Sequence, residues 1–147
     1  MGPRVSIGMP VFNCEWTIGL AVRSILNQTL ADWEFWIIDD GSTDNTLAAA
    51  RSLPDARIHV LSDGAHLGLP RRLNQAVALS RGRYFARMDG DDVAYPERLA
   101  TQVADLDGHS QMALFCARVL LFESDGGIIG TYPFRERDRT GTRLNYS

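Results

Sequence analysis

Three aspartates lie close together directly after an apolar run in this 147-residue chain. They are Asp89, Asp91 and Asp92, within residues 84–96 (YFARMDGDDVAYP). Carboxylates this close repel one another, so folding gains nothing from the cluster unless a positive charge lies against it. Carboxylate oxygens are preferred ligands of hard divalent cations. A divalent metal ion is therefore the partner that this cluster predicts.

Two other loops carry residue types that suit a ligand. One apolar run ends in Pro10, Val11, Phe12 and Asn13, and another is followed by Asp39, Asp40, Gly41 and Ser42. In open α/β sheets the ligand binds outside the carboxyl ends of the strands. We therefore expect these two loops and the aspartate cluster to open on one rim.

The elements that position these loops alternate between strand and helix. Strands are expected over residues 5–11, 33–38, around Val60 and over residues 83–88. Apolar residues at helical spacing predict helices between them, the second of them capped by Ser42, and a fourth helix with Pro96 in its first turn. Two further strands are expected within 112–122 and 127–132, joined by a turn at 124–127. The alternation indicates an α/β fold with an open, mainly parallel sheet and helices on both faces.

Composition excludes several classes of protein. The net charge is −3 and all 15 basic residues are arginine, so a basic nucleic-acid surface, a P-loop lysine and Schiff-base chemistry are not supported. Cys14 and Cys116 lack the spacing of a zinc site or a disulfide framework, which favours a reducing cytosol. No apolar run reaches the roughly 18 residues of a membrane span.

Several motifs in a fixed order resemble family 2 glycosyltransferases of the GT-A fold. They are the strand ending PVFN, the helix ending SILNQT, the loop IIDDGSTDNT, and DGDD, a version of the DxD motif, followed by PERL. The resemblance spans residues 5–131. It implies a Rossmann-like GT-A nucleotide-sugar-binding domain over residues 1–132. The polar tail, residues 133–147, is expected to begin a missing acceptor-binding region.

The resemblance implies a donor site for a nucleotide diphospho-sugar, which we expect to be UDP-linked. Asp40 would accept a hydrogen bond from the imide N–H of the base, and Phe12 would offer a ring face to it. Asp91 would bind Mg²⁺ or Mn²⁺, and Asp89 would contact the ribose or the water shell of the metal. Gly90, between them, allows the backbone to approach the ligand closely. The full set of donor-site residues is Pro10, Val11, Phe12, Glu15, Asp40, Asp89 and Gly90, with Asp91 on the metal.

The same resemblance implies inverting transfer to a saccharide or lipid-linked acceptor, in envelope polysaccharide synthesis at the inner face of the cell membrane. Inversion needs a general base, and no residue here matches the family's base. We expect that base beyond Ser147, and therefore little transfer by this chain alone.

Other interpretations remain open at this point. DGDDV also fits the signature of haloacid-dehalogenase-like phosphatases, with Asp89 as nucleophile, although that signature normally follows the first strand. A nucleotide-sugar-binding module without turnover is a third hypothesis. Structurally, the cluster could be a solvated turn, Phe12 a core residue and Glu15 a favourable charge in a first helical turn. Arg71 and Arg72 could approach the diphosphate, or they could lie on a solvated helix face.

Overall fold

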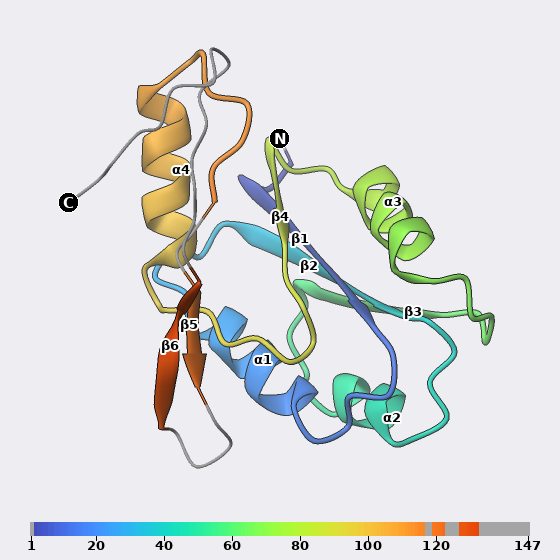
Figure 1. Ribbon diagram of the computed structural model, residues 1–147. Coiled ribbons are helices and arrows are strands. Elements are labelled where there is room, and N and C mark those ends of the chain that lie inside the picture. Colours follow the sequence, from blue (N-terminus) through green and yellow to red (C-terminus); the bar gives the residue numbers. More distant parts are fainter. Residues whose placement is uncertain (1, 117–118, 123–126, 133–147) are drawn as a thin grey trace.

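The structure is a computed structural model that describes residues 2–116, 119–122 and 127–132. Its main sheet has four parallel strands in the order β3-β2-β1-β4 (Figure 1). They are β1 (Val5–Val11), β2 (Trp33–Asp39), β3 (Ile58–Ser62) and β4 (Tyr84–Arg87). The open parallel α/β sheet predicted from the alternation is confirmed.

Helices cover both faces of this sheet (Figure 1). The four are α1 (Ile18–Leu26), α2 (Thr46–Arg51), α3 (Leu69–Leu79) and α4 (Arg98–Gly108). Val5, Ile7 and Met9 of β1 pack in one core cluster with residues of α1, α2 and α4. The alternate residue Gly8 points to the other face, where α3 lies against it. All seven residues of β1 are buried, as expected for a central strand covered on both sides.

A buried polar cluster fastens the sheet at the end opposite the predicted rim. Ser6 and Glu34 are paired in the register of β1 and β2, and the Ser6 hydroxyl donates to Glu34 Oε1 at 2.6 Å. Arg81 then closes over Glu34, donating from Nε to Oε2 at 2.9 Å and from its backbone N–H to Oε1 at 2.7 Å. The backbone N–H of Gly82 donates to the Ser6 oxygen at 2.7 Å. The chain between α3 and β4 is thus bonded to both central strands.

Two details differ from the sequence-based expectations. The N-cap of α2 is Asn45, so Ser42 lies outside this helix; the Ser42 hydroxyl instead accepts the backbone N–H of Asn13. The N-cap of α4 is Glu97, and Pro96 therefore precedes the helix rather than lying in its first turn. The Pro96 carbonyl accepts the backbone N–H of Thr29, which ties the start of α4 to the end of α1.

The two further strands are present as β5 (Val119–Phe122) and β6 (Ile128–Tyr132). They form an antiparallel pair of their own, separate from the four-stranded sheet. Residues 124–126 of the turn expected at 124–127 lie outside the described residues, as does the polar tail.

Substituting Gly8 with alanine should destabilise the fold. A Cβ at this position would lie 2.8 Å from the Ala76 Cβ of α3 and 2.5 Å from Phe85 Cζ. The phenyl ring can turn aside, but Ala76 is fixed to its helix, so we expect a loss of about 1–3 kcal/mol in the free energy of unfolding. Urea titration followed by circular dichroism measures it. The control is Gly108→Ala, where nothing lies within 4 Å of the added Cβ, and it should change the stability by less than about 0.5 kcal/mol.

Candidate donor site

A cleft of about 440 Å³ lies at the carboxyl ends of β1 and β4. Of the residues predicted for a ligand site, five line it together: Pro10, Phe12, Asp89, Gly90 and Asp91. The remaining lining residues are Asn13, Cys14, Trp16, Thr17, Leu69 and Arg87. Two segments more than 70 residues apart in the sequence therefore meet as the topology predicts, because parallel strands end at one edge.

Three of the predicted residues do not line the cleft. Val11 is 4% exposed and belongs to the apolar core. Glu15 accepts the backbone N–H of Asn45 at 2.9 Å, at the start of α2. Asp40 is buried beside the cleft. Their contact with a donor stays a prediction.

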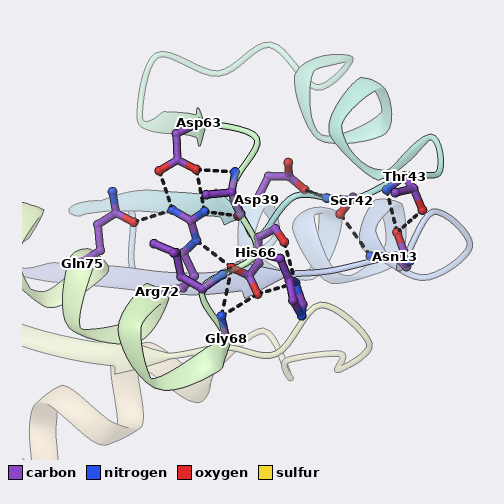
Figure 2. A network of polar contacts seen from close by, with 12 residues as sticks. Asn13, Asp39, Ser42, Thr43, Asp63, His66, Gly68, Arg72 and Gln75 are labelled. Carbon is purple, nitrogen blue, oxygen red and sulfur yellow. Dashed lines mark hydrogen bonds and ion pairs between the residues drawn. The ribbon is translucent and has the colours of Figure 1, made fainter.

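Hydrogen bonds join the β1–α1 loop to the β2–α2 loop (Figure 2). Asn13 adopts a positive φ of 48°, a conformation in which asparagine is enriched. Its side-chain Oδ1 accepts the backbone N–H of Thr43 at 2.8 Å. Asp39 fixes the other side, since its Oδ1 accepts the Ser42 backbone N–H and its Oδ2 accepts the Ser62 hydroxyl. The rim is therefore held in shape before any ligand arrives.

Arg72 is a fully buried arginine that holds the third loop (Figure 2). Its Nε donates to Asp40 Oδ1 at 2.9 Å, and its two Nη groups donate to the two oxygens of Asp63 at 3.0 and 2.6 Å. Gln75 Oε1 and the Ala65 carbonyl accept its remaining two N–H groups. All five donors of the guanidinium are thus used. The expectation of a solvated helix face is wrong for Arg72, because the loop between β3 and α3 folds over it.

The Asp40 carboxylate is bound from several sides. Besides Arg72, it accepts the backbone N–H groups of Leu67 and Gly68 and contacts His66 Nδ1 at 3.1 Å. Burial favours the protonated carboxyl, but these hydrogen bonds outweigh it and hold the pKa of Asp40 below its ordinary value. Asp40 is therefore a charged anchor for the loop that leads into α3.

This anchoring places an aromatic pair beside the cleft. His66 Nδ1 lies 2.9 Å from the Asp40 carbonyl oxygen, and its ring centroid lies 4.3 Å from that of Phe12. Phe12 is 46% exposed, so it is not a core residue, and it keeps a ring face available to a planar ligand. Trp16, at 88% exposed, adds a second large aromatic surface to the lining.

Arginines compensate part of the charge of the aspartate cluster. Arg87, the last residue of β4, donates from Nε and Nη2 to the two oxygens of Asp89, both at 2.9 Å. Asp89 lies beyond the end of β4, so the only signal in the sequence is that an arginine stands two residues before the aspartate cluster. Partial desolvation, together with the charges of Asp89 and Asp91, raises the pKa of Asp92. Positive charge close to the cluster therefore comes from the chain itself as well as from any bound ion.

The cleft also fits a divalent cation of limited protein coordination. Asp91 lines the cleft, and no described residue donates a hydrogen bond to its carboxylate or forms an ion pair with it. Within the described part of the chain, no group of three or more His, Cys, Asp or Glu side chains could enclose an ion. Mg²⁺ is usually held by one or two carboxylates and by substrate phosphates rather than by an all-protein cage. The donor set at Asp91 fits that manner of binding.

Comparison with known proteins identifies the family. The family model described as "Glycosyl transferase family 2" matches residues 6–145, nearly the whole chain. The chain belongs to this family. It is also 37% identical over 128 residues to EpsE of Bacillus subtilis, covering 85% of this chain and 46% of that protein. A relative in Escherichia coli, named UDP-Glc:alpha-D-GlcNAc-diphosphoundecaprenol beta-1,3-glucosyltransferase WfgD, is 37% identical over 100 residues, or 68% of this chain and 40% of WfgD.

Solved structures agree with this assignment. TarS 1–349 of S. aureus in complex with UDP-GlcNAc superposes with a TM-score of 0.68 and 26% identity, over 73% of this chain and 32% of that solved chain. The mannosyltransferase PcManGT from Pyrobaculum calidifontis, in complex with GDP-Man and Mn²⁺, gives a TM-score of 0.66 at 26% identity, over 72% and 33%. The GT-A fold implied by the motifs is thereby shown, and the glycosyltransferase interpretation is favoured over the phosphatase one.

The chain spans less than half the length of EpsE and of WfgD and about a third of each solved structure. Within the residues that the structure describes, no helix is long and apolar enough to cross a membrane.

Replacing Arg72 with methionine should be strongly destabilising. The change leaves the buried Asp40 carboxylate without its cation, and we expect a loss of about 3 kcal/mol in the free energy of unfolding. Chemical denaturation measures it. The double variant Arg72→Met/Asp40→Asn removes the unpaired charge and should recover part of the loss. Equal stability of wild type and Arg72→Met would contradict the anchoring role.

The ion pairs of Arg72 with Asp40 and Asp63 should make the free energy of unfolding depend on pH. The Arg72 guanidinium holds the pKa of Asp63 well below its usual range, and the pKa of Asp40 is lowered as well. Carboxyls whose pKa is lower in the folded state stabilise it above the unfolded value of about 4, and this contribution is lost as the pH falls below that value. Urea midpoints at pH 7 and pH 3 should therefore differ more for the wild type than for Arg72→Met. A larger acid-induced loss in the variant would contradict the assignment.

Proposed function

We propose that the chain is the donor-binding part of an inverting, metal-dependent glycosyltransferase that uses a UDP-linked sugar. The observation that carries this is the cleft, which gathers an exposed aromatic ring at Phe12 and two carboxylates at Asp89 and Asp91 at one strand edge. A nucleotide diphospho-sugar has the matching parts: a planar base, a ribose and an anionic diphosphate.

The base would lie against Phe12, with Pro10 beside it and the loop anchored by Asp40 behind it. The Asp40 carboxylate already accepts hydrogen bonds from its own chain. We therefore propose that Asp40 contributes to nucleobase binding chiefly by fixing the position of this loop and of His66. UDP as the nucleotide is supported by the UDP-GlcNAc complex of TarS and by the UDP-Glc named for WfgD.

The diphosphate would lie next to Asp91, with Mg²⁺ or Mn²⁺ between them. PcManGT, with Mn²⁺ in its complex, supports a divalent ion. Such an ion stabilises the negative charge of a leaving diphosphate when it is bound. Asp89 would lie at the ribose or in the water shell of the ion, and Gly90 would let the backbone approach closely. A Cβ at Gly90 would lie 3.0 Å from Cys14 Sγ and 3.1 Å from Val11 Cγ1, so these side chains would have to shift to admit it.

We place the acceptor-binding site and the general base in the segments of the relatives that lie outside the part matched by this chain. We propose a saccharide or lipid-linked acceptor at the inner face of the cell membrane, supported by the lipid-diphosphate acceptor in the name of WfgD. The chain by itself is then a donor-binding module with little transfer activity.

Isothermal titration with UDP tests the donor site. Wild type should bind UDP more tightly with Mn²⁺ than with EDTA, and Asp91→Ala should remove this enhancement, a loss of at least about tenfold in affinity, because charge-assisted contacts are the strong ones. Asp32→Ala is the control and should bind as wild type does, because Asp32 is an exposed aspartate just before the amino end of β2 and does not line the cleft. Binding of UDP that is absent, or indifferent to Mn²⁺, would contradict the proposal.

A further inference from the structure

The cleft holds a cation of its own whose role the donor-site proposal leaves open. Among the described residues that line it, Arg87 is the one lysine, arginine or histidine. A diphosphate brings negative charge into a cleft that already contains Asp89 and Asp91, so its binding needs more positive charge than one divalent ion supplies. Arg87 is placed to provide it.

In the present structure the Arg87 guanidinium donates hydrogen bonds to both oxygens of Asp89. The Arg87 side chain is 49% exposed and that of Asp89 is 39% exposed, so water reaches both. Ion pairs of this exposure are weak and exchange readily with other partners. A divalent ion at the two carboxylates would be such a competitor for Asp89, since carboxylate oxygens are its preferred ligands.

Only the side chain of Arg87 would have to move. Its backbone is paired with Gly8 of β1, and its carbonyl oxygen accepts Nη2 of Arg98 at 2.8 Å. The following residue, Met88, is buried and donates its backbone N–H to the Gly8 carbonyl at 3.0 Å. The exposed guanidinium is therefore attached to a fixed point at the edge of the cleft.

We propose that Arg87 is a diphosphate-binding residue which Asp89 holds until a divalent ion takes over the carboxylate. The planar fork of donors that now matches the Asp89 carboxylate also matches two phosphate oxygens. In the donor complex, the Arg87–Asp89 ion pair would thus be replaced by two contacts. Asp89 would face the divalent ion, and Arg87 would donate to the diphosphate. The inference rests on the donor-binding function proposed above and adds a residue to it.

The exchange predicts effects of opposite sign in one variant. Arg87→Ala should raise the affinity for Mn²⁺ alone by about threefold, because the competing cation is gone. The same variant should lower the affinity for UDP at saturating Mn²⁺ by about tenfold, because a charge-assisted contact to the diphosphate is lost. Free Mn²⁺, counted by electron paramagnetic resonance, measures the first, and isothermal titration measures the second.

Two further variants make the test specific. Arg87→Gln keeps the apolar stem and should show the same opposite pair of changes, which guards against a folding defect in the alanine variant. Arg83→Ala is the matched control: Arg83 precedes the same strand and pairs with Asp107 at 3.0 Å, far from the cleft lining, and its loss should change neither affinity.

Each outcome has one meaning. If both affinities fall together in the Arg87 variants, or neither changes, Arg87 merely orients Asp89 or is idle, and the inference is overturned while UDP binding by the wild type still supports the donor site. If the wild type itself fails to bind UDP with Mn²⁺, the proposed function fails, and the inference fails with it.

Discussion

Arg72 is a buried cation held between Asp40, which follows β2, and Asp63, which follows β3. Taking a guanidinium out of water is costly, and it persists here because every one of its donors finds an acceptor. The arrangement fixes the loop that leads into α3, and with it His66 and the neighbouring face of Phe12. The shape of the cleft wall therefore depends on charges that the cleft itself does not expose.

The acidic loop after β4 also contains an aspartate–arginine ion pair, but this pair is more exposed than that of Asp40 and Arg72. Asp40 is enclosed and paired with Arg72, whereas Asp89 is paired at the surface and Asp91 lines the cleft without a partner among the described residues. Burial makes an ion pair hard to exchange, and exposure makes it easy. One chain thus uses aspartate–arginine contacts for two purposes, a permanent anchor on one side of the cleft and an exchangeable contact on the other.

The sequence predicted the strands, the helices and the shared rim because these depend on apolar periodicity, which is a local signal. It also predicted five of the lining residues, since they directly follow strands. Arg72 escaped prediction because its burial comes from the loop after β3, which folds over it and accepts its Nη2 at the Ala65 carbonyl; no spacing in the sequence reveals that. The placement of Ser42 was wrong for a related reason: a serine before a helix suits a cap, but the neighbouring loop offered its hydroxyl another donor, the Asn13 backbone. Where a side chain binds across loops, the partner is decided by tertiary structure.

The polar cluster at the opposite end of the sheet has a consequence for folding. Glu34 is 3% exposed, and its carboxylate is neutralised by Arg81, a residue 47 positions later. Until α3 has formed and brought Arg81 back, pairing β1 with β2 would enclose an anion with only the Ser6 hydroxyl to compensate it. The first two strands are therefore incomplete as a unit, and a slip of one residue between them would turn the Glu34 carboxylate toward the apolar core. The charge of Glu34 thus couples the pairing of β1 and β2 to the segment that follows α3, since Arg81 lies there.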